Sequence, residues 1–195
     1  MAINVLENHL YTRVSEALDA IPAGEATDVY ALSFWAYPED DDPRRQVLDF
    51  SYNTNAQAET SAEYASDAGE ARWNFAYWLQ NSLALIGNLE DSVGARARQS
   101  WLNSLRLNYS DEDEENDFER CNQLARKIER EFWQLCARVG RRLHDEGLVT
   151  AKFGHGLPIL IHNQEYDERV LDVTRKANPD GVCAEFEAWV NSLRT

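Results

Sequence analysis

The sequence predicts an α+β fold, in which an N-terminal helix and an antiparallel β-hairpin extended by a further strand pack against several amphipathic helices. Residues 28–54 contain two stretches of alternating side chains joined by a charged connection with two prolines, the pattern of a hairpin. Elsewhere apolar residues recur every three or four positions, as in helices buried on one side. The predicted order shows no regular βαβ alternation, which favours α+β over α/β.

A first helix is predicted over residues 3–21. Its apolar positions follow a helical spacing and are Ile3, Leu6, Leu10, Val14, Ala17 and Ile21. The pattern stops before Pro22 and Gly24, residues that end helices. Because such an apolar stripe must be covered, we expect this helix to dock on one face of the hairpin.

The two arms of the hairpin alternate with a period of two. In the first arm, Tyr30, Leu32, Phe34 and Ala36 are expected on one face, with Val29, Ala31, Ser33, Trp35 and Tyr37 on the other. In the second arm, Leu48, Phe50 and Tyr52 are expected to oppose Val47, Asp49 and Ser51.

The middle of the chain gives mixed signals. Residues 55–70 are small and polar and fit a short helix or a loop. Residues 71–88 have Phe75, Leu79, Leu83 and Ile86 at helical spacing, although the aromatic cluster at 73–78 also fits an extended chain; we expect a helix. A short helix over 96–107 is expected to bury Trp101 and Leu105.

The strongest helix pattern follows an acidic run at 110–120. Its apolar positions are Phe118, Cys121, Leu124, Ile128, Phe132, Leu135, Val139 and Leu143, and Gly147 is expected to end the helix. A short strand is then predicted at 157–161. Two further helices separated by the sequence NPDG at 178–181 complete the chain.

Composition limits the class of protein. With 195 residues, the chain is long enough for one well-buried core, and we expect a single globular domain over 1–195. An apolar content of 44% with six Trp excludes a disordered chain. The 34 acidic and 19 basic residues give a net charge of -15, which argues against nucleic acid and anionic membranes as partners.

The cysteines and the N-terminus predict a cytoplasmic protein. The three cysteines form no CxxC pair and fit reduced thiols better than a disulfide framework. No signal-peptide pattern and no apolar run long enough to span a bilayer is present in the sequence. The chain is expected to be a monomer or a homodimer, the latter closed by a sheet edge or an apolar helix face.

Two acidic clusters are the leading candidates for partner binding, because clustered charge steers association with a surface of opposite sign. The candidate residues are Glu39, Asp40, Asp41, Asp42, Asp111, Asp113 and Glu114, with Trp35 or Tyr37 as a buried anchor. The alternative is that these residues only solvate a loop and complement a helix dipole. An EF-hand is excluded because Asn116 and Asn122 occupy positions that need Gly and Glu.

A second candidate site comprises His155, His162 and Glu165, which lie close in sequence around the last predicted strand. Such a set could hold a catalytic metal or act as an acid and base pair, so a small-ligand or metal-binding enzyme with a pocket near His162 and Glu165 is the alternative function. The spacing does not match a helical ligand pair, and the chain has no nucleophile motif or phosphate-binding glycine loop. We therefore expect no metal and no cofactor, and a non-catalytic protein.

Four segments resemble an uncharacterised bacterial family, domain of unknown function 4303. They are DVYALSFWAYPEDDDPRR, EARWNFAYWLQN, KFGHGLPILIHNQEYDE and ANPDGVCAEFEAWV, in that order along the chain. The family is similar in size and character to small acidic proteins encoded beside bacterial polymorphic toxins, many of which are immunity proteins. The resemblance implies an acidic binding protein that docks on a basic protein partner, and it implies no catalytic residue. A structural homodimer subunit remains a further alternative.

Overall fold

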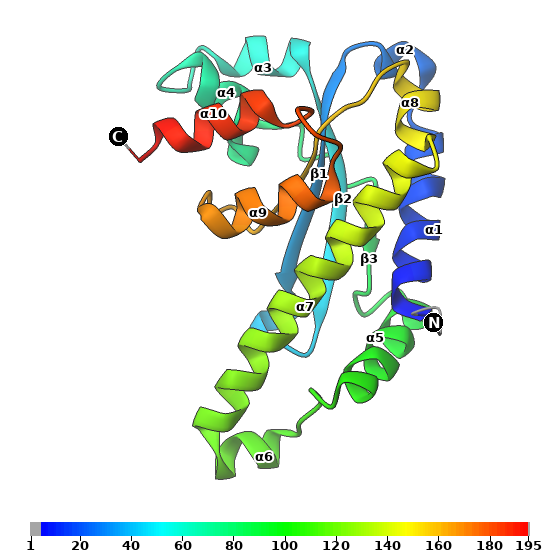
Figure 1. Cartoon of the computed structure of the whole chain (residues 1–195), viewed down its shortest axis with the longest axis vertical. Coiled ribbons are helices and arrows are strands. Elements are labelled where there is room, and N and C mark those ends of the chain that lie inside the picture. The colour runs from blue at the N-terminus through cyan, green and yellow to red at the C-terminus, as the bar shows by residue number, and fades with distance from the viewer. Residues whose placement is uncertain (1–4, 195) are drawn as a thin grey trace.

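A computed structural model describes residues 5–194 and confirms the α+β prediction, with helices packed on a mixed four-stranded sheet (Figure 1). The strands are β1 (Val29–Pro38), β2 (Gln46–Thr54), β3 (Ala84–Ile86) and β4 (Ile159–His162). They lie in the order β3-β2-β1-β4. β1 pairs antiparallel with β2 and parallel with β4, and β3 joins the other edge of β2 antiparallel. The hairpin is therefore extended on both sides.

The hairpin register follows the predicted alternation from Ala31 to Pro38, and an irregularity between Val29 and Ala31 interrupts it at the start of β1. Phe34 pairs with Phe50, and their rings lie 5.8 Å apart in an edge-to-face arrangement. On the other side of β1, Leu32 is aligned with Ile159 of β4. Most side chains of both hairpin strands are buried, because segments of the chain cover both faces of the sheet.

One face of the sheet is covered by three helices: α1 (Val5–Ala20), α7 (Phe118–Asp145) and α9 (Glu168–Ala177). α7 crosses β1, β2 and β4, while α1 packs on β2 and β3 and α9 packs on β4. This confirms the docking expected for the first helix. The predicted position Ile3 lies outside the described residues.

Smaller helices complete the fold (Figure 1). They are α2 (Ala23–Ala26), α3 (Asn55–Ser61), α4 (Ala68–Trp73), α5 (Ser92–Leu105), α6 (Asp111–Asn116), α8 (Leu148–Phe153) and α10 (Ala184–Ser192). α5 packs on α1, and α10 packs on α4. Two short 3-10 turns occur at Glu39–Asp41 and Phe75–Tyr77.

The single helix predicted over 71–88 is wrong. α4 ends at Trp73, and Asn74 then accepts a hydrogen bond from the amide of Ala76, which starts a new turn. The aromatic residues of this segment fold back on Tyr30 of β1, with the Trp73 ring 5.4 Å and the Trp78 ring 5.9 Å from it. The chain then pairs with β2 as β3. Tertiary packing therefore overrides the helical period of the segment.

Two expected core residues are exposed. Leu105 is 41% exposed, because α5 buries Ala97, Trp101 and Leu102 instead. Phe118 is 65% exposed at the first position of α7. The acidic run before it forms the separate helix α6, so only Glu119 contributes acidic charge to the first turn of α7.

The long helix predicted after the acidic run is confirmed. α7 runs through the predicted positions and is followed by Gly147, whose φ of +78° is the left-handed conformation that ends helices. All three cysteines are unpaired and buried. No helix between residues 5 and 194 is both long and apolar enough to cross a membrane.

Candidate protein-interaction surface

The connection between β1 and β2 is a compact, hydrogen-bonded loop. The amide of Glu39 donates to the carbonyl of Arg45 at 2.9 Å, and the amide of Arg45 donates to the carbonyl of Asp42 at 2.8 Å. Asp40 and Asp41 have φ values of +53° and +57°, which aspartate tolerates better than most residues. Both are exposed to solvent. The loop therefore holds its exposed carboxylates on a backbone whose conformation is fixed by hydrogen bonds.

Arg45 pairs with two carboxylates of this loop. Its Nη2 atom lies 2.7 Å from Glu39 Oε2, and its Nη1 atom lies 2.6 Å from Asp40 Oδ2. Glu39 Oε1 also accepts a hydrogen bond of 3.3 Å from the amide of Leu89. These contacts fix Glu39 in place. The side chain of Asp40 remains 70% exposed, and Asp41 has no ion-pair partner within residues 5–194.

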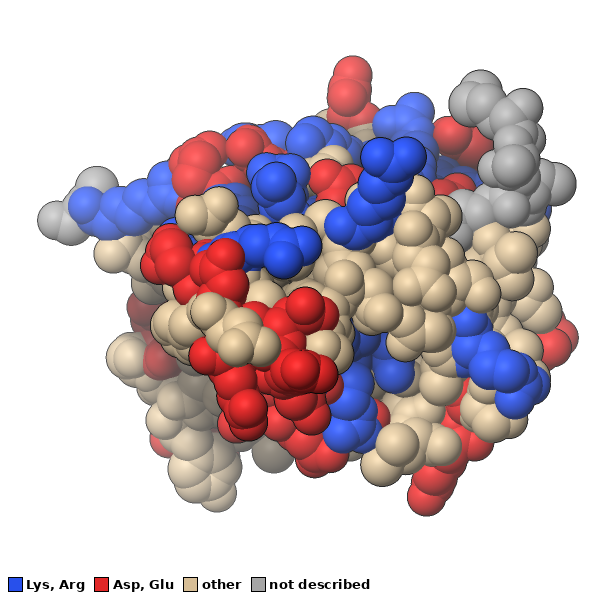
Figure 2. Space-filling model, turned by 90° about the horizontal axis from the view of Figure 1, so that it is seen from below, with Lys and Arg blue, Asp and Glu red and all other residues tan. Residues whose placement is uncertain are grey.

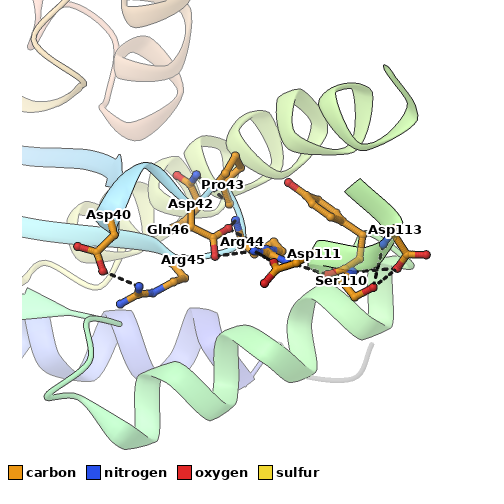
Figure 3. Close-up of polar contacts among 10 residues, drawn as sticks. Asp40, Asp42, Pro43, Arg44, Arg45, Gln46, Ser110, Asp111 and Asp113 are labelled. Carbon is orange, nitrogen blue, oxygen red and sulfur yellow. Dashed lines mark hydrogen bonds and ion pairs between the residues drawn. The ribbon is translucent and has the colours of Figure 1, made fainter. Parts of the chain in front are cut away.

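Arg44 joins this loop to the second acidic cluster (Figure 3). It holds Asp42 with two parallel hydrogen bonds, from Nε at 2.8 Å and from Nη2 at 3.0 Å. The same Nη2 atom lies 2.7 Å from Asp111 Oδ1, while Nη1 donates to the carbonyl of Tyr109 at 3.3 Å. The guanidinium carbon also lies 5.0 Å from the centre of the Tyr109 ring, within cation–π range. One arginine thus ties together segments 67 positions apart in the sequence.

Burial and hydrogen bonding act oppositely on Asp42. Its partial burial raises the pKa of the carboxyl, but the hydrogen bonds from the side chain and amide of Arg44 outweigh this effect and lower the pKa below its ordinary value. Asp42 is therefore charged at neutral pH and committed to Arg44. It serves to position the loop and is less available to a partner than Asp41.

α6 is held by its own first turn. Ser110 and Asp113 form a capping box: the Ser110 hydroxyl accepts from the Asp113 amide at 3.1 Å, and the Asp113 carboxylate accepts from the Ser110 amide at 2.8 Å. Hydrogen bonds from the backbone and hydroxyl of Ser110 lower the pKa of Asp113. Asp113 thus has a structural task, whereas Glu114 is half-buried and the side chain of Asp111 is 85% exposed beside Arg44.

We call residues 39–45 and 110–119 together the acidic end. Figure 2, which looks at the molecule from below, shows Asp and Glu side chains gathered in one region that is bordered by neutral surface and by Lys and Arg side chains. Within the described chain, several carboxylates of this region form no ion pair: Asp41, Glu112, Asp113, Glu114, Glu115, Asp117 and Glu119. The two arginines of the loop therefore leave a clear excess of negative charge.

The expected anchors Trp35 and Tyr37 lie in β1 rather than on an open surface. The Trp35 ring packs 4.5 Å from that of Tyr37 and 5.5 Å from that of Phe75, and both side chains are half-buried. Sequence reasoning missed two better exposed apolar side chains: Phe118, 65% exposed, and Leu89, 70% exposed. Phe118 follows Asp117 directly, and Leu89 touches Glu39 through its amide. The charged neighbours of Phe118 in the sequence were a signal of its exposure.

Arg98 is a buried arginine that binds the backbone next to the loop between β1 and β2. Its side chain is only 7% exposed, and Nη1 donates to the carbonyls of Gln46, at 3.1 Å, and Gly87. Burial lowers the pKa of this guanidinium. Arg98 thereby connects the start of β2 to the turn after β3, where Leu89 lies. The sequence does not indicate this contact, because Arg98 stands within an amphipathic helix.

The second predicted set of residues is not assembled into one site. His162 is 1% exposed, with Nε2 2.8 Å from the Ser33 hydroxyl, and burial lowers its pKa to about 3. Glu165 is exposed and forms no hydrogen bond or ion pair with His162 in the described chain. His155 lines a separate cleft. In the described part of the chain, no group of three or more His, Cys, Asp or Glu residues is arranged to hold a metal ion.

The structure therefore defines an α+β protein with a pronounced acidic end. Comparison with models of protein families, with curated proteins and with solved structures found no match to this chain.

Proposed function

We propose that this chain is a non-catalytic binding protein of the immunity type, which docks through its acidic end on a basic surface of a partner protein in the cytoplasm. The observation that carries the proposal is the Arg44 bridge, because it joins both acidic clusters in one arrangement. If the two acidic clusters were separate, solvation alone would explain why each of them is charged. A joined surface has the excess charge that selects a partner of opposite sign.

The exposed apolar side chains at this end support the same proposal. Interfaces derive much of their binding energy from a few apolar or aromatic anchors surrounded by polar residues. Phe118 offers an aromatic ring and Leu89 an aliphatic side chain, each next to an acidic residue. A basic cleft or rim on the partner would pair with the carboxylates, while Phe118 would fill an apolar hollow.

The division of tasks among the carboxylates determines how the proposal is tested. Asp42 and Asp113 maintain local structure, so replacing them would disturb the fold of the loop or of α6. Asp41, Glu112 and Glu115 are exposed and have no ion-pair partner in the described chain. Neutralising these three changes the surface charge and leaves the Arg44 and Arg45 contacts in place.

The experiment is affinity capture from the native cytoplasm with three baits. The wild-type chain is compared with D41N/E112Q/E115Q and with a control, D19N/E59Q/E63Q, which removes the same charge from other exposed positions. We expect the wild type and the control to retain one basic protein that the acidic-end variant loses or retains weakly. Capture that is equal for all three baits, or no specific capture by the wild type, would contradict the proposal.

A further inference from the structure

A cleft of about 450 Å³ opens at the end of β1 opposite the acidic end. Its walls come from the start of β1, the segment before β4, and the region where α3, α4 and α10 gather in Figure 1. Since β1 has ten residues, this cleft lies about 30 Å from the hairpin connection. Its volume falls within the range of pockets that hold small molecules. It is thus a separate feature from the acidic end.

Arg72 is the charged group around which this cleft is built. Its guanidinium carbon lies 3.9 Å from the centre of the Tyr30 ring and 5.2 Å from that of Trp73. The backbone carbonyl of Arg72 accepts hydrogen bonds from the Tyr30 hydroxyl and, at 2.9 Å, from Trp78 Nε1. Arg72 is therefore held in position before any ligand arrives, which reduces the entropic cost of binding.

The guanidinium retains free donor capacity. Nη1 donates to Asn55 Oδ1 at 3.0 Å, while Nε meets Glu185 Oε2 only at 3.5 Å, longer than an ordinary charged hydrogen bond. Nη2 has no hydrogen-bond partner among residues 5–194. Glu185 is 76% exposed and free to turn away. The Nε and Nη2 edge is thus available for a carboxylate that binds through both of its oxygens.

His155 supplies a second polar group on the wall of the cleft. Its Nδ1 atom lies 3.0 Å from the carbonyl oxygen of Phe153 and must carry a proton, because a carbonyl can only accept. The atom left to meet a ligand is therefore Nε2. Apolar wall is provided by Leu157 and Val182.

We propose that this cleft binds a small monocarboxylate with an apolar body, with the carboxylate on Arg72 and the apolar part against Leu157 and Val182. A guanidinium pairs with a carboxylate through two parallel hydrogen bonds, and a single arginine next to Glu185 balances the one negative charge of a carboxylate better than the roughly two of a phosphate monoester. In this arrangement the ligand replaces Glu185 on the guanidinium. Glu185 then competes with the ligand, so removing its charge strengthens binding.

The test is an NMR titration of the full chain, with phenylacetate as the probe and phenylacetamide as its neutral counterpart. We expect phenylacetate to shift the side-chain signal of Arg72 and the indole signal of Trp73, and phenylacetamide to bind at least tenfold more weakly. Arg72→Gln should weaken phenylacetate binding by roughly tenfold to a hundredfold. Glu185→Gln should tighten it severalfold.

Two further variants keep the test decisive. Arg72→Lys preserves the positive charge but not the two parallel hydrogen bonds to the carboxylate, so it should also weaken binding. It replaces Arg72→Gln in the test if Arg72→Gln does not fold. Lys127→Gln removes one positive charge from exposed surface outside the cleft and should leave binding unchanged. Equal shifts with the amide, no response at millimolar phenylacetate, or weaker binding by Glu185→Gln would overturn the proposal.

Discussion

At the scale of single residues, Arg44 joins the two acidic clusters of the proposed surface. It is the only residue of the described chain that forms ion pairs with both Asp42 and Asp111, and its side chain is 21% exposed. Lysine could match its charge but not its paired hydrogen bonds to Asp42. The geometry of the acidic end therefore depends on this guanidinium.

Replacing Arg44 with alanine should lower the free energy of unfolding by about 1–3 kcal/mol, because two charged hydrogen bonds to a partly buried carboxylate are lost. Urea unfolding measures this change. The free energy of unfolding of Arg44→Lys is expected to lie between those of Arg44→Ala and the wild type. A change within the roughly 0.5 kcal/mol of ordinary surface substitutions would show that the bridge does not stabilise this end.

His162 gives a prediction about pH. Its pKa is lowered by burial to about 3 from an ordinary 6.5, so the unfolded chain gains a proton below pH 6.5 that the folded chain does not accept until near pH 3. Stability should therefore fall on acidification, by roughly 2 kcal/mol between pH 7 and pH 5 from this residue alone. His162→Gln should remove that part of the loss in urea titrations. If the wild type and His162→Gln lost the same stability between pH 7 and pH 5, this result would contradict a neutral, buried His162.

At the scale of elements, α7 explains why an aromatic side chain is exposed at the acidic end. The helix has 28 residues and is about 42 Å long, longer than the strands that it crosses. Its first turn reaches past the sheet toward α6, as Figure 1 shows, so the apolar stripe continues where there is no core to cover it. The periodicity of the sequence specifies a stripe but not where the underlying sheet ends.

The contrast between two phenylalanines of α7 tests this explanation. Phe118→Ala should change the free energy of unfolding by less than about 0.5 kcal/mol, whereas Phe132→Ala, in the core, should cost about 3–5 kcal/mol. Chemical denaturation of both variants measures the difference. A large cost at Phe118 would mean that it is packed and unavailable to a partner.

The elements also show what the sequence could predict. The hairpin, the first helix, α7 and the last strand have local patterns that agree with their final surroundings, so their positions were predictable. β3 was not, because its three residues are fixed by pairing with β2. The bridge between Arg44 and Asp111 was equally hidden, since it depends on how distant segments fold together. Each acidic cluster could be predicted from the sequence as a candidate binding site, but the contact that joins the two clusters could not.

At the scale of the whole molecule, the acidic end and the cleft around Arg72 lie at opposite ends of the hairpin. The hairpin strands carry the acidic connection at one end and the start of the cleft around Arg72 at the other. A ligand in the cleft and a protein on the acidic end would therefore not exclude each other by contact. The net charge of -15 acts over the whole surface, so tests of the acidic end need controls of equal charge.

The most direct test is the association rate between the chain and the basic partner that capture identifies, measured by stopped flow over a series of salt concentrations. We predict fast association at low salt for the wild type and for D19N/E59Q/E63Q, and a rate at least about tenfold lower for D41N/E112Q/E115Q, with the difference shrinking as salt rises. Equal rates for the two triple variants at low salt would show that overall charge, and not the acidic end, drives association.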